Sequence, residues 1–236
     1  FENTELFIRG IGTDTDIVNK EMFSWVDQGG NALTLKPELT APVARAYLQH
    51  QLASQHPLHR LYYLDTLFRR ERPQKGRQRQ FYQFGAEAIG SPNPEQDAEI
   101  ISMAYHIYRD FDIQEMEVRI NSIGSAEIRP VYLELLRKTL NKYSGELCKT
   151  CETRLKKNAL RIFDCKNTEC QNILAEKAPY IFDSISDNDR QHFDSVTRML
   201  NEINIPFKHD KTLIRGLDYY SHTTFEIISS SLGAQD

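Results

Sequence analysis

Residues 61–90 read LYYLDTLFRRERPQKGRQRQFYQFGAEAIG. Two runs rich in aromatic and aliphatic residues, Leu61–Arg70 and Gln80–Ile89, flank a short polar segment. This pattern is typical of two antiparallel strands joined by a loop of more than two residues. We therefore expect a β-hairpin here.

The second strand of this hairpin has two chemically different faces. Because side chains alternate along a strand, Tyr82 and Phe84 should share an apolar core face with Ala86 and Ala88. The opposite face carries a ring, an amide, a gap and a carboxylate: Phe81, Gln83, Gly85 and Glu87. Glycine weakens a strand unless another group must approach closely, so this face is a candidate site. A plain solvated face is the alternative.

The first strand and the loop add charge to the polar face. Arg69 and Glu71 share one face at the end of the first run. The loop contributes four cations within eight residues, Arg72, Lys75, Arg77 and Arg79. If the polar faces of the two strands lie on the same side of the hairpin, that side presents a fixed guanidinium, carboxylates and a stacking ring. The basic loop would then lie at its edge.

Upstream segments predict a second, smaller hairpin and a helix. Glu21–Val26 alternates like a strand, the sequence DQGG at 27–30 indicates a tight turn, and Ala32–Leu35 is the expected returning strand. Helical spacing begins near Thr40, two residues before Pro42, where threonine is a good N-cap.

Three segments resemble signature motifs of a single family. FRRERPQKGRQRQF at 68–81 resembles the second motif of class II aminoacyl-tRNA synthetases, in the form typical of histidyl-tRNA synthetases. LIRGLDYYSHTTFE at 213–226 is similar to the histidine-specific motif of that family, and TLKPELTAPVARAY at 34–47 to its amino-acid-binding segment. The three matches occur in the family's order and span nearly the whole chain, so it is identified as a member of this family.

The resemblance implies an α+β fold, with a class II synthetase-type antiparallel β-sheet flanked by helices and a helical insertion. We expect the first part of the catalytic core over 1–127, the insertion over 128–206 and the second part of the core over 207–236, truncated before the final motif. In this family the insertion leans over the acceptor arm of the RNA.

Length and composition fit this interpretation. A chain of 236 residues with a net charge of −4 is one large domain, or a domain with an insertion, rather than a strongly basic nucleic-acid module. Any RNA contact should therefore be local to the basic loop at 72–79. There is no long apolar run and no leader-like segment, so we expect a cytoplasmic protein without a membrane span. Both ends look cut, which indicates a fragment of a longer protein.

The implied activity is the ATP-dependent activation of L-histidine to histidyl-adenylate, followed by transfer to the 3′ end of tRNA(His). Neither step needs a protein nucleophile, so positioning and charge stabilisation carry the catalysis. Arg69 and Arg215 are the implied catalytic residues, donating to the α-phosphate from two sides. Mg²⁺ would bridge phosphate oxygens of ATP. The family also implies a homodimer.

The resemblance assigns binding roles to individual residues. The implied histidine-binding residues are Glu38, Thr40, Arg69, Gln83, Glu87, Arg215, Tyr219 and Tyr220. The implied ATP-binding residues are Arg69, Glu71, Arg77 and Phe81. Phe81 would stack on adenine, and Glu71 would accept from the adenine amine. Glu87 and Tyr220 would hold the imidazole nitrogens. A pocket built in this way rejects other amino acids, because their side chains would leave Glu87 and Tyr220 without hydrogen-bond partners. The family usually has glycine at the position of Leu39.

A non-catalytic relative is the main alternative. The regulatory subunit of ATP phosphoribosyltransferase resembles histidyl-tRNA synthetase and needs to keep only the histidine pocket. The presence of Arg69, Glu71, Phe81 and Arg215 favours the enzyme, whereas the sequence PELTAP at 37–42 favours the regulatory relative. A purely structural RNA-binding module does not explain the acids Glu38 and Glu87.

All four cysteines of the chain fall within the predicted insertion, at Cys148, Cys151, Cys165 and Cys170. The first pair has the spacing of a zinc knuckle, and the second pair is looser than usual. A reducing compartment argues against disulfides. A structural zinc site and ordinary scattered thiols both remain open, and the family as a whole does not depend on zinc.

Overall fold

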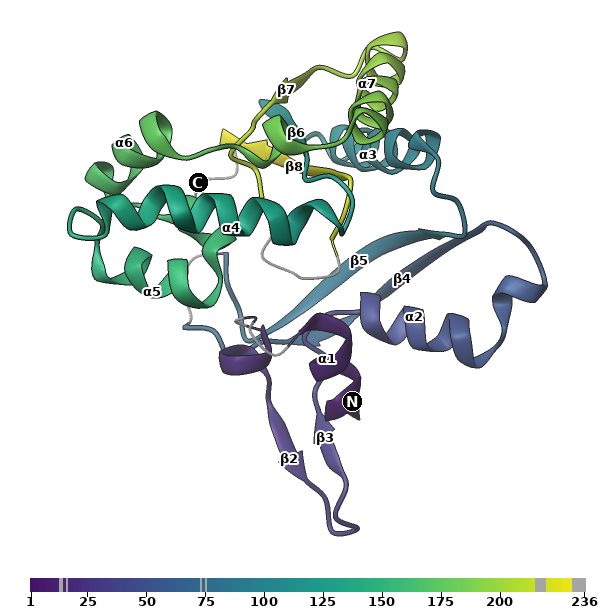
Figure 1. Cartoon of the computed structure of the whole chain (residues 1–236). Coiled ribbons are helices and arrows are strands. Elements are labelled where there is room, and N and C mark those ends of the chain that lie inside the picture. Colours follow the sequence, from purple (N-terminus) through teal and green to yellow (C-terminus); the bar gives the residue numbers. More distant parts are fainter. Residues whose placement is uncertain (13–14, 16, 73, 75, 215–219, 231–236) are drawn as a thin grey trace. The chain divides into compact units, whose positions relative to one another are not determined.

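The computed structural model describes residues 1–12, 15, 17–72, 74, 76–214 and 220–230. The chain packs as two units, Phe1–Pro92 and Asn93–Leu232 (Figure 1). Both combine helices with β-strands, as the predicted α+β class requires.

The first unit contains two β-hairpins and two α-helices. Its elements are β1 (Glu2–Asn3), α1 (Thr4–Ile11), the π-helical turn η1 (Ile17–Glu21), β2 (Ser24–Val26), β3 (Ala32–Thr34), α2 (Thr40–Gln49), η2 (Leu52–Ser54), β4 (His59–Phe68) and β5 (Gln80–Ile89). Strands β1, β3 and β2 form an antiparallel sheet in that order. The predicted turn at residues 27–30 is confirmed, and Gly30 adopts a φ of +83° that favours glycine. The predicted strand at Glu21–Val26 begins only at Ser24, because Glu21 ends η1.

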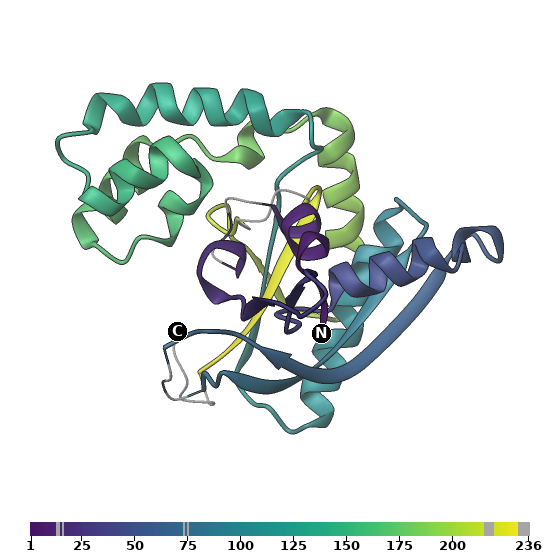
Figure 2. The same ribbon diagram turned by 90° about the horizontal axis from the view of Figure 1, so that it is seen from below.

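The long hairpin β4–β5 is confirmed over nearly the predicted range. All ten residues of each strand pair in an antiparallel ladder from His59 opposite Ile89 to Phe68 opposite Gln80. The two strands form a long twisted ribbon (Figure 2). Leu67, near the end of β4, is fully buried.

The prediction of a core face on this hairpin is wrong. Tyr82 and Phe84 expose 76% and 47% of their surface, and the neighbouring Tyr62 and Leu64 on β4 expose 88% and 71%. The predicted alternation of side chains between the two faces of the hairpin is correct, because these four side chains lie on the same face. The face is exposed because nothing in the described chain covers it, and alternation reports which side chains share a face rather than what packs on that face.

The second unit is built on a three-stranded sheet with several helices. Its elements are α3 (Pro94–Asp110), β6 (Met116–Ser122), α4 (Ile128–Leu140), η3 (Asn141–Tyr143), α5 (Lys149–Lys157), η4 (Ala159–Asp164), α6 (Thr168–Lys177), η5 (Ile181–Ser184), α7 (Asp187–Glu202), β7 (Phe207–His209) and β8 (Thr223–Ser229). Central β6 pairs parallel with β7 and antiparallel with β8. Among the described residues, no helix is long and apolar enough to cross a membrane.

Two separate cores stabilise the second unit. We call the first the sheet core, which consists of Ala98, Ile101, Val118, Ile120, Phe182, Ile185, Phe193, Val196, Leu200 and Ile205. We call the second the insertion core, which consists of Ile123, Tyr132, Leu136, Leu140, Leu147, Cys151, Leu155, Ala159, Leu160, Ile162, Cys165, Cys170, Leu174, Ala178 and Ile181. In both views α4 runs alongside the shorter α5 and α6 (Figure 1, Figure 2).

Helix α7 belongs to the sheet core although it lies within the predicted insertion. Its residues Phe193, Val196 and Leu200 share that core with Ala98 and Ile101 of α3. A reciprocal capping box of Ser186 and Asp189 satisfies its first backbone N–H groups, which fixes where the helix begins. The three-part division at 127/128 and 206/207 stays a prediction.

Candidate active site

The segment between β3 and α2 lies across the polar face of the hairpin. The backbone N–H of Phe68 donates to the Lys36 carbonyl at 2.9 Å, and Nε of Arg69 donates to the Pro37 carbonyl at 2.8 Å. The Lys36 ammonium also forms an ion pair with Asp65 of β4. These contacts bring Glu38 and Thr40 to the hairpin strands, the first of which begins only at His59.

Glu38 caps the start of α2. Its Oε2 accepts from the backbone N–H of Thr40 at 2.8 Å, and its Oε1 accepts from that of Ala41 at 3.0 Å. The prediction that Thr40 is the N-cap is therefore wrong, because the helix already begins at Thr40 and Leu39 occupies the cap position. The Thr40 hydroxyl is thus directed to another partner.

That partner is Glu87 at the centre of the polar face. The Thr40 hydroxyl donates to Oε1 of Glu87 at 2.8 Å. Burial raises the pKa of Glu87, against the hydrogen bonds from Thr40 and Tyr63 that lower it. Burial also raises the pKa of Glu38, with a further upward contribution from the charge of Glu87 and opposing backbone hydrogen bonds at the helix start. Two half-buried carboxylates therefore share one small region.

Tyr63 is a site residue that sequence reasoning missed. It lies directly opposite Gly85 in the ladder, and its ring fills the space above the glycine. A Cβ at Gly85 would come within 2.4 Å of Cζ of Tyr63. Its hydroxyl interacts with Glu87, Thr40 and Gln83, and burial is the main reason that its pKa is raised. The signal was present in the sequence, since Gly85 indicated a close approach without identifying the approaching group.

We call these five residues the acidic cluster: Glu38, Thr40, Tyr63, Gln83 and Glu87. The structure brings together four of the predicted histidine-binding residues in this cluster, through hydrogen bonds from two separate segments of the chain. Leu39, where the family usually has glycine, has an ordinary φ of −122°. Its side chain is 6% exposed, so the substitution fills space without straining the backbone.

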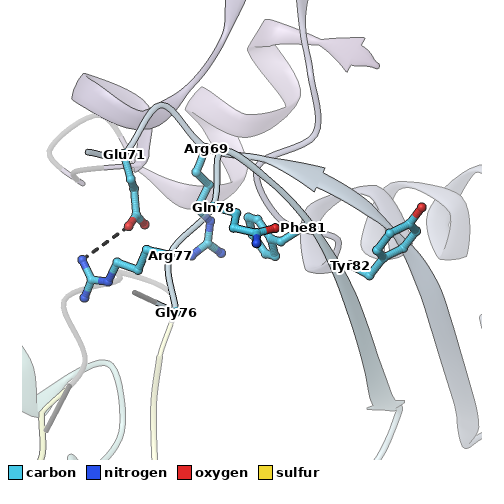
Figure 3. A pocket seen from close by; sticks show the side chains of 7 residues that line it. All are labelled: Arg69, Glu71, Gly76, Arg77, Gln78, Phe81 and Tyr82. Carbon is cyan, nitrogen blue, oxygen red and sulfur yellow. Dashed lines mark ion pairs between the residues drawn. The ribbon is translucent and has the colours of Figure 1, made fainter. Parts of the chain in front are cut away.

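A cavity of about 430 Å³ opens near the end of the same hairpin. It is lined by Arg69, Glu71, Gly76, Arg77, Gln78, Phe81 and Tyr82 (Figure 3). The Arg69 guanidinium lies over the Phe81 ring, 5.3 Å from its centroid. Tyr82 stands apart from the other labelled side chains (Figure 3). All four predicted ATP-binding residues therefore border one cavity.

Glu71 and Arg77 form an ion pair across this cavity. Nη1 of Arg77 lies 3.3 Å from Oε2 of Glu71, drawn as a dashed line in Figure 3. Among the described residues, this buried oxygen has no partner with hydrogen-bond geometry, which leaves it able to accept from a ligand. Arg79 is tied to the loop, because its Nε donates to the Glu71 carbonyl at 3.3 Å.

Three predicted residues belong to the histidine-specific motif. Arg215 and Tyr219 lie outside the described residues, so their predicted roles stay predictions. Tyr220 belongs to the second unit, where its side chain packs against the insertion core. Its carbonyl accepts from Nη2 of Arg129 at 3.2 Å. The predicted pairing of Tyr220 with Glu87 likewise stays a prediction.

Comparison with protein families gives a match over residues 1–235 to the model described as "Histidyl-tRNA synthetase". The chain belongs to the histidyl-tRNA synthetase family. It is 49% identical over 236 residues to the histidine–tRNA ligase of Halothermothrix orenii, covering 100% of this chain and 56% of that protein. The ligase of Clostridioides difficile is 47% identical over 235 residues, again covering 56% of its length. The chain thus spans a little over half the length of these histidyl-tRNA synthetase relatives.

The fold is also that of a histidyl-tRNA synthetase. Apo S. aureus histidyl-tRNA synthetase superposes with a TM-score of 0.70 at 35% identity, covering 96% of this chain and 50% of that one. A Bacillus halodurans protein titled as an ATP phosphoribosyltransferase regulatory subunit/histidyl-tRNA synthetase has a TM-score of 0.64 at 20% identity, which shows a shared fold alone. The predicted fold class is confirmed.

Proposed function

We propose that the protein containing this chain activates L-histidine with ATP to form histidyl-adenylate and then transfers the histidyl group to the 3′ end of tRNA(His). The acidic cluster carries this proposal, because two half-buried carboxylates, Glu38 before α2 and Glu87 on β5, suit a small substrate with an ammonium group beside a nucleotide-sized cavity. Membership of the histidyl-tRNA synthetase family supports it.

The acidic cluster is the proposed histidine site. Among the described residues, no lysine or arginine forms an ion pair with Glu38 or Glu87, so neither charge is neutralised within that part of the chain. A buried carboxylate without a counter-ion is costly, and a bound cation would remove that cost. The α-ammonium of histidine fits Glu38, and an imidazole N–H fits Glu87. Tyr219 and Tyr220 would complete the proposed site.

The cavity beside the cluster is the proposed ATP site. The Phe81 ring offers a stacking surface for adenine, as aromatic rings do for nucleic-acid bases. Oε2 of Glu71 is ion-paired with Arg77 but accepts no hydrogen bond among the described residues, so it is suited to accept one from the adenine amine. Arg69 is positioned by the Pro37 carbonyl and the Phe81 ring. Its remaining N–H groups have no hydrogen-bond partner in the described part of the chain, so they are suited to a phosphate and a carboxylate.

These placements support a direct displacement at phosphorus. A carboxylate oxygen of histidine attacks the α-phosphorus, the bond to the bridging oxygen breaks, and pyrophosphate leaves with the magnesium that entered with ATP. A ribose hydroxyl of the tRNA then attacks the histidyl carbonyl and AMP leaves. Arg69 stabilises the charge on the α-phosphate, and Arg215 is the proposed second donor.

The remaining partners follow from the same proposal. The exposed Arg72 and Arg77, next to the cavity, are suited to contact the phosphates of ATP or of the tRNA end. A homodimer and a cytoplasmic location are proposed on the basis of family membership and the role in translation.

The decisive experiment is histidine-dependent ATP–pyrophosphate exchange by the full-length protein, followed by charging of tRNA(His). We expect exchange with L-histidine and none with other amino acids. A regulatory relative would bind histidine in equilibrium dialysis without supporting exchange. That result would overturn the proposed function.

A further inference from the structure

All four cysteines of the chain converge on one point in the second unit. Cys148, Cys151, Cys165 and Cys170 place their sulfur atoms within 4.8 Å of one another. The sulfurs of Cys148 and Cys165 are 3.9 Å apart, and none of the four is in a disulfide. Residues that lie up to 22 positions apart in sequence therefore meet in space. Chance scattering of thiols through a core does not predict such a meeting.

Three short elements deliver these sulfurs. Cys148 is the N-cap of α5 and Cys151 is the third residue of that helix. Cys165 directly follows η4, and Cys170 is the third residue of α6. Two helix N-termini, each with a partial positive charge, therefore carry three of the four thiols. It is the thiolate form of cysteine that binds a metal.

The distances between the four sulfur atoms match those around a single tetrahedrally coordinated ion. Four sulfurs at a Zn–S distance of about 2.3 Å lie about 3.8 Å apart at the corners of a tetrahedron. The observed 3.9 Å between Cys148 and Cys165 corresponds to one such edge. A disulfide needs a separation of about 2.05 Å and would pair the sulfurs two by two instead of gathering all four.

We propose that this cluster binds one Zn²⁺ through four thiolates, releasing the thiol protons to solvent. Soft thiolate ligands in a tetrahedral set favour zinc over Mg²⁺ or Ca²⁺. Because all four positions are protein ligands, no site remains for water or substrate, and the zinc is structural rather than catalytic.

Backbone and side-chain hydrogen bonds hold the ligands in place. The backbone N–H of Cys148 donates to the Cys170 sulfur at 3.2 Å, as in metal knuckles. The Asn167 side chain accepts from the backbone N–H of Cys170 at 3.0 Å, and Nε2 of Gln171 donates to the Cys165 carbonyl at 3.1 Å. These hydrogen bonds therefore orient the ligands around the point where the ion would lie.

Zinc would join three short elements of the second unit. The elements that it joins are a helix of 9 residues, a 3₁₀ segment of 6 and a helix of 10, each too short to be stable alone. They pack around the insertion core, in which three of the cysteines are themselves buried members. Formation of this core is thus coupled to metal binding.

The test is metal analysis of the full-length protein, purified without chelator and without a metal-affinity step. We expect a zinc content that falls by one equivalent per chain in the double variant Cys148→Ser/Cys165→Ser. Cobalt added to the demetallated protein should give the visible bands of a tetrahedral thiolate site in the wild type and not in the double variant.

Leu174→Ala is the matched control, because it opens the same core without removing a ligand. It should lower the unfolding midpoint while the zinc content stays at the wild-type value. The proposal is overturned if the wild type and the double variant carry equal zinc, if the reduced wild type neither contains nor takes up zinc, or if mass spectrometry finds the four thiols in disulfides.

Discussion

The hydroxyl of Thr40 donates a 2.8 Å hydrogen bond to Oε1 of Glu87, which lies 47 residues further along the chain. This contact joins the first turn of α2 to the polar face of β5. Because Glu38 caps the same helix turn, both carboxylates of the acidic cluster are positioned by where α2 begins. The following predictions test how much the proposed histidine site depends on this arrangement.

Replacing Thr40 with valine should weaken histidine binding. Valine keeps the shape but removes the donor, so Glu87 loses one of the hydrogen bonds that orient its carboxylate. A hydrogen bond to a charged group contributes about 1.5–3 kcal/mol, so we expect KM for histidine to rise about 10-fold to 150-fold. The measurement is ATP–pyrophosphate exchange by the full-length protein. Thr40→Ser keeps the hydroxyl and should stay near wild type; equal losses in both variants would contradict the proposed role.

Glu87→Gln should abolish most of the affinity for histidine. The amide has the size of the carboxylate but lacks its charge, and removing one partner of a buried charge pair costs about 2–5 kcal/mol. Isothermal titration calorimetry should then show histidine binding weakened by at least about 30-fold. The exposed Glu134→Gln makes the same chemical change away from the acidic cluster and should have no effect. Wild-type affinity in Glu87→Gln would remove Glu87 from the site.

The pKa of Glu87 is raised by burial, which sets the sign of a pH effect on stability. The folded state favours the neutral carboxyl, so this group stabilises the fold below its unfolded pKa and loses that contribution as pH rises through the folded pKa. The free energy of unfolding of Glu87→Gln relative to wild type should therefore increase from about pH 4 towards pH 8. Urea unfolding at each pH measures this difference, and a flat or falling difference would refute the raised pKa.

Arg69→Lys should reduce the rate of adenylate formation. Lysine cannot donate to the Pro37 carbonyl, lie flat over Phe81 and fork onto a phosphate at once, as the guanidinium can. Losing one preorganised donor costs on the order of 10²–10³ in rate. Single-turnover formation of histidyl-adenylate isolates this step. The exposed neighbour Arg70→Lys is the control, and equal rates in the two variants would show that Arg69 has no special role.

Gly85→Ala should displace Tyr63. The added Cβ would lie 2.3 Å from the Tyr63 hydroxyl oxygen, so the ring must move away from Glu87. Overpacking of this kind costs about 1–3 kcal/mol, and thermal unfolding should show it together with weaker histidine binding. Gly145→Ala is the matched control, because an added Cβ there meets nothing within 4 Å. An unchanged midpoint in Gly85→Ala would show that the Tyr63 ring is free to move.

Local patterns in the sequence were sufficient for the long hairpin β4–β5 and for the residue types of the site. Alternation of side chains along 80–89 correctly separated the face of Glu87 from the face of Tyr82, because the two-residue period is a property of every strand. The same alternation could not tell that the Tyr82 face is exposed, since exposure depends on what packs there.

Contacts between distant segments were decided only by the tertiary structure. Thr40 as a hydrogen-bond donor to Glu87, and Tyr63 above Gly85, depend on strand register and on where α2 begins, which no local pattern encodes. The spacing of Cys165 and Cys170 left a metal site open, and only the packing of α5 against η4 and α6 brings the four sulfurs together. Local preference is set by each residue's own backbone and neighbours, whereas convergence of side chains is set by the whole packed chain.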